Sequence, residues 1–188
     1  MSQHDIQNTP QDRIQYHEYK IILQPQHFTS PQAFKDFWQI VKTTAKKYDV
    51  KVKEAEAAFE SHVREVLFFD TEDFALYRNH FIFRLRTRYK GGWPDGIPEV
   101  TFKFRHPEFE KAAAVDVRPG ASGGIARIKF KEEFLPMRET LGGKRSIFSH
   151  NCVLAKPRED LDMAVKDLAA AFPAVGTLEA NHESPLRL

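Results

Sequence analysis

The sequence predicts an α+β protein in which helices pack against an antiparallel β-sheet. Apolar and polar residues alternate along several stretches of the chain, which is the pattern of strands with one buried face. Two other stretches repeat apolar residues at helical spacing, as in helices that cover a sheet. The chain also holds sixteen phenylalanines, against two tryptophans and five tyrosines. Phenylalanine supplies large buried area and suits pleated surfaces, so the composition favours a sheet-rich core.

Length and charge restrict the organisation and the partners. At 188 residues the chain is long enough for one domain with a substantial core. We expect the polar residues 1–13 to form a mobile arm and residues 14–188 to form that single domain. The formal net charge is only +2, because 26 acidic residues nearly balance 28 basic ones. A nucleic-acid partner is therefore not expected, although a local cationic patch is compatible with this balance.

Cysteine content and hydropathy indicate the compartment. The single Cys152 excludes an internal disulfide and gives no zinc pattern, so we expect it to be a small core residue. The N-terminus has no apolar segment, and no run of about 18 apolar residues occurs in the sequence. We expect a cytoplasmic protein with no membrane partner. The sequence gives no signal for an oligomeric state.

The first third of the chain predicts one strand and two helices. Alternating aromatic, β-branched and polar residues predict a strand over residues 14–23. Ser30 as N-cap and Pro31 at the first helical position predict a helix that continues to about residue 48. Its aromatic stripe is typical of a helix packed on a sheet. Residues 51–61 are rich in alanine and glutamate, and we expect a second short helix there.

The middle of the chain predicts two strands joined by an acidic turn, and then a third. Residues 63–69 form the first strand, and residues 70–79 form a turn or short helix. The second strand begins at Phe81 and ends in three arginines at alternate positions. Residues 90–98 contain glycine and proline in a turn pattern, and residues 99–106 alternate again.

The last third predicts a loop, two strands and a helix. Residues 106–124 contain a short apolar patch and a loop rich in glycine and proline that should be flexible. Residues 125–135 alternate as a strand, and residues 146–155 form a further strand. Residues 160–172 begin with acidic residues and stop before Pro173, which predicts a helix.

Four of the predicted strands concentrate charge on one face, since successive side chains of a strand point to opposite sides. The charged positions on these faces are Glu18 and Lys20, then Arg84, Arg86 and Arg88, then Lys103 and Arg105, and finally Arg127, Lys129, Lys131 and Glu133. A solvated sheet face usually mixes both signs of charge, whereas cations dominate here. From the pattern alone, a solvated surface and the wall of an anion site both stay open.

The anion that suits such a wall is a polyphosphate. Arginine makes planar bidentate contacts to phosphate oxygens, and lysine supplies a compact charge. The expected phosphate-binding residues are Arg84, Arg86, Lys103, Arg105, Lys129 and Lys131. Mg²⁺ or Mn²⁺ prefers oxygen ligands and can bridge phosphates to protein, and Glu18 with Glu133 would be the carboxylate pair that holds it.

Other polar groups predict structure rather than chemistry. Eight histidines are scattered without the spacing of metal ligands. The acidic turn that starts at Asp70 could attract a metal, but such turns more often cap a helix, with Asp70 or Thr71 as the cap. Gly91 and Gly92 lack a following lysine and threonine, so they predict a loop rather than a phosphate-binding turn.

Three segments together resemble a known superfamily. HEYK near the start, FFDTEDFALYRNHFIFRLR in the middle and TFKFR after it are similar to the CYTH-like triphosphate tunnel metalloenzymes, which include thiamine triphosphatases and class IV adenylyl cyclases. The similarity covers roughly residues 14 to 135, and the middle segment is its most specific part. It implies a closed antiparallel β-barrel, or tunnel, with a hydrophilic cationic interior and helices packed outside.

The resemblance also implies roles for single residues. Arg84, Arg86, Lys103 and Arg105 would bind a triphosphate, Glu18 and Glu133 would hold the metal, and Lys20 would neutralise or orient the reacting end. Water activated by the metal would then attack a terminal phosphorus.

Two features depart from the family pattern. The family's later acidic strand, which completes its metal site, has no clear counterpart after residue 135, and Glu133 stands in for it. Tyr16 stands where the family's E-x-E-x-K strand has its first glutamate. The expected function is metal-dependent hydrolysis of an organic triphosphate or inorganic tripolyphosphate. A non-catalytic module that binds polyphosphate or nucleotide, and a class IV-like adenylyl cyclase, are the alternatives.

Overall fold

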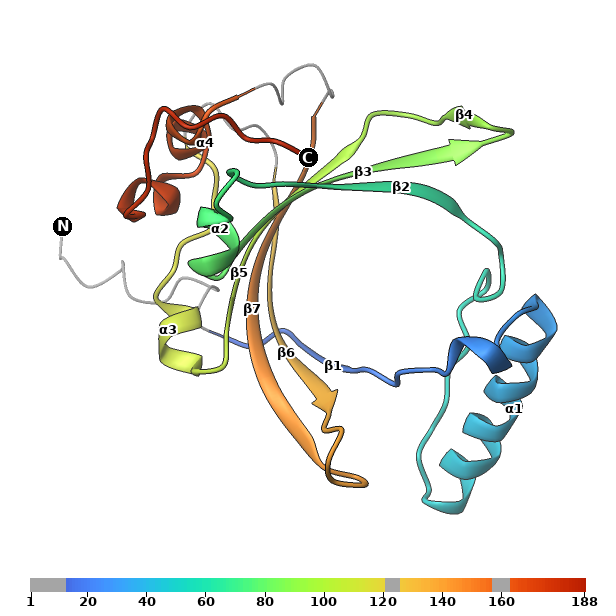
Figure 1. Cartoon of the computed structure of the whole chain (residues 1–188). Coiled ribbons are helices and arrows are strands. Elements are labelled where there is room, and N and C mark those ends of the chain that lie inside the picture. Colours follow the sequence, from blue (N-terminus) through green and yellow to red (C-terminus); the bar gives the residue numbers. More distant parts are fainter. Residues whose placement is uncertain (1–12, 121–125, 157–162) are drawn as a thin grey trace, which may run out of the picture. The chain divides into compact units, whose positions relative to one another are not determined.

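The computed structural model describes residues 13–120, 126–156 and 163–188, and the chain divides into two compact units (Figure 1). One unit, which we call the sheet unit, contains the described residues of Met1–Lys20 and Val63–Leu188. The other, which we call the helical unit, is Ile21–His62. The predicted arm of residues 1–13 lies outside the described residues except for Arg13.

The sheet unit contains a mixed sheet of seven strands in the order β1-β6-β7-β5-β3-β2, with β4 paired to β3. The strands are β1 (Tyr16–Tyr19), β2 (Val63–Phe69), β3 (Phe81–Lys90), β4 (Trp93–Pro94), β5 (Glu99–His106), β6 (Arg127–Pro136) and β7 (Lys144–Ala155). β2 and β5 begin and end where the sequence predicts, and β5 has one apolar and one polar face.

The direction of β1 differs from the prediction. β1 is shorter than expected and lies parallel to β6, with Tyr16 opposite Lys131 and Glu18 opposite Glu133. A parallel pair needs a long crossover connection, and here most of the chain lies between the two strands. The alternation within a strand does not carry its direction, so the expectation of a purely antiparallel sheet was wrong for this pair.

The sheet is open in the part of the chain that the structure describes. β1 lies at one edge and β2 at the other, and no pairing joins these two strands among the described residues. The α+β class is confirmed, whereas closure into a barrel is not shown.

Helices occupy four segments of the described chain. They are α1 (Pro31–Lys47), α2 (Ala75–Arg78), α3 (Phe109–Ala113) and α4 (Val165–Ala171), and two 3₁₀ turns, η2 (Pro25–His27) and η4 (Pro173–Thr177), accompany them. α3 was not predicted, since it lies inside the segment expected to be a loop. α4 lies within the predicted C-terminal helix, and residues 160–162 of that prediction lie outside the described residues.

The acidic turn caps α2, as one of the two interpretations predicted. The Asp70 carboxylate accepts hydrogen bonds from the backbone N–H groups of Thr71, Leu76 and Tyr77, and the Thr71 hydroxyl accepts one from Ala75. The carboxylate therefore satisfies backbone donors of the turn and of the start of α2, which would otherwise lack partners.

The core lies on the apolar face of the sheet. Phe83, Leu85 and Phe102 are buried there, and Phe102 stacks on Phe172 with 4.3 Å between ring centroids. Side chains from α2, α4, η4 and the C-terminal segment complete this cluster. Cys152 is buried in it as predicted, and burial raises the pKa of its thiol to about 12.

The helical unit has no buried residue. The Ser30 hydroxyl accepts a hydrogen bond from the Ala33 N–H, which confirms the predicted start of α1. The expected second helix at residues 51–61 is wrong, because the structure has only a turn there. A helix this short depends on packing of an apolar face, and the side chains of this segment instead line an open cavity with those of α1.

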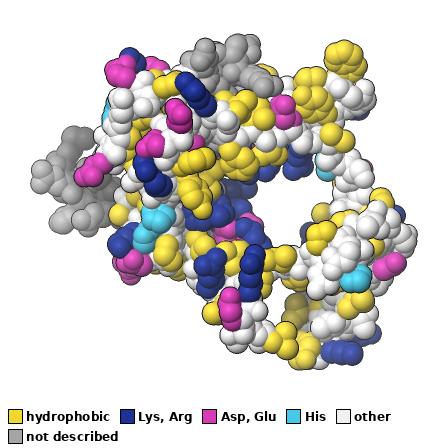
Figure 2. Space-filling view, viewed as in Figure 1, with side chains coloured by type: hydrophobic (Ala, Val, Ile, Leu, Met, Phe, Trp, Pro, Cys, Tyr) yellow, Lys and Arg dark blue, Asp and Glu magenta, His cyan; other side chains and the backbone are white. Residues whose placement is uncertain are grey.

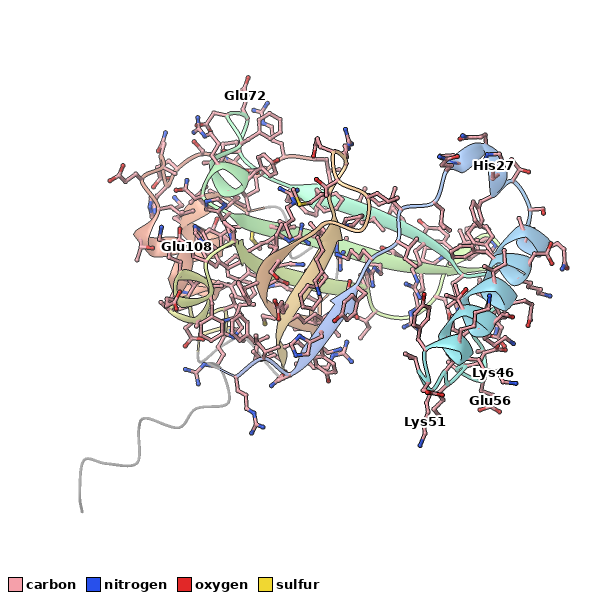
Figure 3. The ribbon with its side chains drawn as sticks, turned by 90° about the horizontal axis from the view of Figure 1, so that it is seen from below. His27, Lys46, Lys51, Glu56, Glu72 and Glu108 are labelled. Carbon is pink, nitrogen blue, oxygen red and sulfur yellow. The ribbon has the colours of Figure 1, made fainter. Side chains whose placement is uncertain are left out.

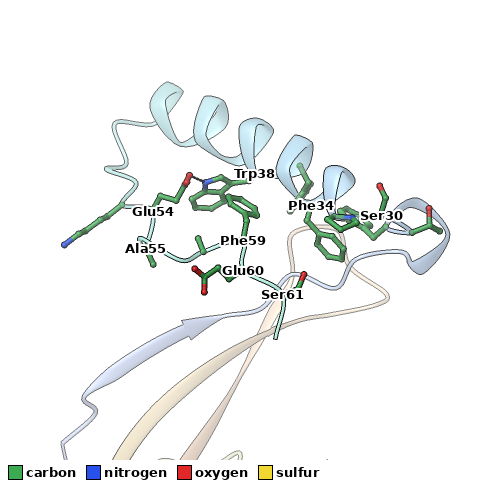
Figure 4. A pocket seen from close by; sticks show the side chains of 14 residues that line it. Ser30, Phe34, Trp38, Glu54, Ala55, Phe59, Glu60 and Ser61 are labelled. Atoms are coloured by element: carbon green, nitrogen blue, oxygen red, sulfur yellow. Dashed lines mark hydrogen bonds between the residues drawn. The ribbon is translucent and has the colours of Figure 1, made fainter. Parts of the chain in front are cut away.

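That cavity has a volume of about 630 Å³ and lies within the helical unit (Figure 4). Phe34 and Trp38 of α1 face Ala55 and Phe59 across it, and the Trp38 indole N–H donates to the Glu54 carboxylate. Charged side chains such as Lys46, Lys51 and Glu56 project from the surface of this unit, as Glu72 does from the sheet unit (Figure 3), and these three do not line the cavity.

Candidate functional site

The charged side chains of the strands gather on the side of the sheet opposite the core (Figure 2). The alternation of β3, β5 and β6 directs their apolar residues into the core and their charged residues to this second side. We call it the cationic face. The predicted residues that it carries are Glu18, Lys20, Arg84, Arg86, Lys103, Arg105, Lys129, Lys131 and Glu133.

Glu133 is the centre of the cationic face. Glu133 is only 1% exposed, which is unusual for a charged residue. The Lys103 ammonium donates to it at 2.7 Å and the Arg105 guanidinium at 3.0 Å, and the Lys20 ammonium makes a third ion pair. The Ser149 hydroxyl adds a hydrogen bond of 2.8 Å. Four donors, from two other strands and from the residue after β1, therefore converge on one carboxylate.

Electrostatics favour the charged form of Glu133. Burial by itself would raise the pKa of Glu133, but hydrogen bonds from Lys103 and Lys20 outweigh this and hold the pKa well below its usual range. Burial lowers the pKa of Lys103 to about 8, against the opposing hydrogen bond to Glu133. Lys103 therefore loses its proton at a lower pH than an ordinary lysine does.

Glu18 forms a second, more exposed centre beside the first. The Lys131 ammonium donates to it at 2.8 Å, and the Lys20 ammonium lies 3.3 Å from it. The hydrogen bond from Lys131 is the main reason that the pKa of Glu18 is lowered. Lys20 thus lies between Glu18 and Glu133 and pairs with both, so one cation joins the two predicted carboxylates.

Arg84 and Arg86 occupy the part of the cationic face formed by β3. The Arg84 guanidinium donates to the Thr101 hydroxyl at 3.1 Å, and Arg86 pairs with Glu99 at 3.4 Å. The Nε atoms of both arginines are buried and have no hydrogen-bond partner among the described residues. Burial, together with the neighbouring charge of Arg86, lowers the pKa of Arg84. These two arginines have donors left for another acceptor.

Lys129 lies on the same face but outside the Glu133 cluster. Its ammonium lies 5.4 Å from the centre of the Tyr16 ring, a cation–π contact. Tyr16 is the residue that replaces the family's first acidic position, so the lysine here meets an aromatic ring where the resemblance would place a carboxylate. Arg88 is exposed near the end of β3.

Several residues of the cationic face were not predicted. Ser149 and Asn151 of β7 lie opposite Arg105 and Lys103 in the strand register, and the Asn151 amide donates to the Ser149 hydroxyl at 3.1 Å. Thr101 and Glu99 contact the arginines of β3. In the sequence, Ser149 and Asn151 alternate with His150 and Cys152, and this alternation was the available signal. Neither side chain carries a charge, so the pattern of charged residues did not include them.

Glu18 and Glu133 are the predicted ligands of a divalent metal ion. Among the described residues no group of three or more His, Cys, Asp or Glu side chains could hold a metal ion. Two carboxylates, Glu18 and Glu133, do share one cation, the Lys20 ammonium. Carboxylate oxygens are ligands of the kind that hard divalent ions prefer, and here the Lys20 ammonium pairs with both carboxylates.

The comparisons with known proteins add no relative. No family model, no curated protein and no solved structure matches this chain. Within the described ranges, no helix has the length and apolar character needed to cross a membrane.

Proposed function

We propose that the cationic face binds the phosphates of a triphosphate-containing small molecule or of inorganic tripolyphosphate. The observation that carries the proposal is the excess of cations on one side of the sheet, where the carboxylate of Glu133 is already shared by three of them. Like charges on neighbouring strands repel one another, and an anion relieves that repulsion. The guanidinium groups of Arg84 and Arg86, which contact Thr101 and Glu99, would also donate to phosphate oxygens.

We further propose that the bound triphosphate is hydrolysed with the help of Mg²⁺ or Mn²⁺. Glu18 and Glu133 would hold the ion, which would neutralise phosphate charge and activate water. Arg84, Arg86 and Lys103 would hold the phosphate chain, and Lys20 would turn from the two carboxylates toward the reacting end. Phosphoryl transfer depends mostly on position and charge, so this face needs no covalent nucleophile.

A non-catalytic binding module is the second candidate, and two observations favour it. Tyr16 removes one acidic ligand of the pattern implied by the resemblance, and Glu133 has its oxygens occupied by Lys20, Lys103, Arg105 and Ser149. A metal would have to compete with these donors. Closure of the sheet into a tunnel around the anion, as in the CYTH-like enzymes, remains part of the proposal and not of the observed fold.

Binding is tested with tripolyphosphate in a titration calorimeter. Arg84→Ala and Lys103→Ala should each weaken binding by about 1 to 3 kcal/mol, since each removes a charge-assisted contact. Lys166→Ala is the matched control, because Lys166 is an exposed lysine of α4 that pairs with Glu183. Equal affinity in wild type and in both cationic-face variants would show that these cations are solvated surface.

Hydrolysis is tested by phosphate release from tripolyphosphate, ATP and thiamine triphosphate with Mg²⁺ or Mn²⁺. Release that is lost in Glu18→Gln supports the metal-dependent reaction. Tight binding of tripolyphosphate without release from any of the three compounds would reject the enzyme and leave the binding module.

A further inference from the structure

A large apolar cavity of the sheet unit lies where β2 ends and α2 begins, and residues from both faces of the sheet line it. Its volume is about 870 Å³, and most of its lining is apolar. Phe68, Phe74, Tyr77, Ile82 and Leu188 contribute large side chains to it. Hydrophobic side chains gather over β2 next to the lysines and arginines of the sheet (Figure 2).

Three of the aromatic side chains at this cavity face solvent. Phe68 is 57% exposed, Phe74 is 62% exposed and Tyr77 is 72% exposed. Large aromatic residues seldom gather at the surface without a partner. None of these three rings belongs to the hydrophobic core cluster of the sheet unit.

The backbone holds Phe74 at the cavity in a conformation that costs energy. Phe74 has a φ of 58°, in the left-handed region that bulky residues rarely adopt. The hydrogen bonds of the Asp70 carboxylate and the Thr71 hydroxyl fix the turn around it. A strained residue that its surroundings hold in place is a common feature of binding sites.

The strand register places the cavity against the phosphate-binding residues. Phe68 of β2 lies directly opposite Arg84 of β3, and Ile82 of β3 lies directly opposite Lys103 of β5. Residues directly opposite in an antiparallel pair share one face, with Cβ atoms roughly 5 Å apart. Two residues that line the cavity are therefore the immediate neighbours of two cations of the proposed phosphate site.

We propose that this cavity binds the flat aromatic group of an organic triphosphate whose phosphates lie on Arg84 and Lys103. The inference rests on the proposed function and selects the organic class of ligand over inorganic tripolyphosphate. An aromatic ring stacks on Phe68 and is enclosed by Phe74 and Ile82, whereas tripolyphosphate leaves this apolar surface exposed. Arg84, directly opposite Phe68, supplies a guanidinium for the phosphate end.

The test separates the aromatic group from the phosphates. Titration calorimetry measures the affinities of ATP, GTP, CTP, thiamine triphosphate and tripolyphosphate, without divalent ions and again with Mg²⁺. Phe68→Ala should weaken at least one aromatic triphosphate about fivefold or more, because stacking on a side chain has that size. The affinity for tripolyphosphate should not change. Arg84→Ala should weaken both kinds of ligand.

Two further variants exclude indirect effects. Phe74→Gly removes a ring of the cavity while it relieves the left-handed conformation, so it should weaken the aromatic ligand without loss of stability. Trp93→Ala is the matched control, because Trp93 is 77% exposed on β4 and does not line the cavity. It should leave every affinity unchanged.

The outcomes distinguish this inference from the proposed function. If tripolyphosphate binds but Phe68→Ala weakens none of the four aromatic triphosphates more than tripolyphosphate, the cavity is not the aromatic subsite and the phosphate site stands. If neither tripolyphosphate nor any aromatic triphosphate binds the wild-type protein, the proposed function fails and this inference fails with it.

Discussion

On strand β5 two consecutive residues meet opposite surroundings. Phe102 is fully buried among the aromatic side chains of the core and stacks on Phe81 and Phe172. Lys103 points to the other face and pairs with Glu133. The same alternation repeats on β3, where Leu85 is buried between Arg84 and Arg86. Each of these strands therefore contributes at once to a packed core and to a charged surface.

The two faces of the sheet differ in how far contacts within the described chain satisfy their side chains. On the core face, helices and the C-terminal segment cover the apolar side chains, and Leu186 is buried there. The backbone of the next residue, Arg187, forms an isolated β-bridge with Asp70. On the cationic face, lysines and arginines outnumber Glu18, Glu99 and Glu133. A hydrophobic core gains free energy from its own contacts, whereas a surface of like charges is stabilised by an anion. This difference predicts that substitutions on the two faces will act on different measurements.

The largest effect is expected on the core face. Phe102→Ala should lower the free energy of unfolding by about 3 to 5 kcal/mol, because it leaves a cavity in a buried aromatic stack. Urea denaturation measures the loss. Trp93→Ala, at an exposed site, should change the stability by less than about 0.5 kcal/mol. A similar loss in both variants would contradict the assignment of the core to this face.

Glu133→Gln tests whether the cationic face depends on its central carboxylate. The substitution leaves Lys20, Lys103 and Arg105 without their shared partner, and breaking a buried ion pair costs about 3 kcal/mol of stability. Tripolyphosphate should restore part of this loss, since an anion can replace the missing charge, and thermal unfolding with and without it measures the recovery.

Glu18→Gln provides the comparison for that experiment. Glu18 is much more exposed than Glu133, and a surface ion pair contributes at most about 1 kcal/mol. If Glu18→Gln destabilised the protein as much as Glu133→Gln, burial would not explain the role of Glu133.

The alternation of residues was sufficient to predict much of this arrangement. β2 and β5 have the predicted bounds, and the shared face of Lys129, Lys131 and Glu133 follows directly from a period of two. The closeness of Lys20 to Glu133 did not follow, because it requires β1 to lie beside β6. That neighbour is selected by a long-range crossover, and no local pattern encodes it.

The remaining errors arise from contacts that local sequence patterns do not carry. Residues 51–61 have helix-forming composition, yet tertiary contacts decide whether so short a helix is stable. Ser149 was missed because a hydroxyl carries no charge, and its value comes from the carboxylate that it meets across the strands. Charge patterns therefore predicted the ligands of the site more readily than the uncharged groups that hold Glu133 in place.

The smallest expected effect is the dependence of binding on the protonation of Lys103. Burial lowers the pKa of Lys103 to about 8, although its hydrogen bond to Glu133 opposes the shift. Above that pH the lysine loses the charge that attracts phosphate, so the affinity for tripolyphosphate should fall by about fivefold, or ~1 kcal/mol. Titrations of tripolyphosphate between about pH 7 and about pH 9.5 measure this fall in affinity. Lys103→Arg should remove the portion of the fall that Lys103 causes, since arginine stays charged over this range.

The free energy of unfolding should depend on the protonation of Lys103 with the opposite sign. The pKa of Lys103 in the folded protein lies below the ordinary value of 10.5, so between these two values the unfolded chain holds more protons. The contribution of Lys103 to the free energy of unfolding therefore rises with pH, while its contribution to anion binding falls. Measured against Lys103→Arg, this pair of opposite slopes assigns the change to Lys103 itself. Parallel pH profiles of affinity in the two proteins would show that Lys103 does not contact the anion.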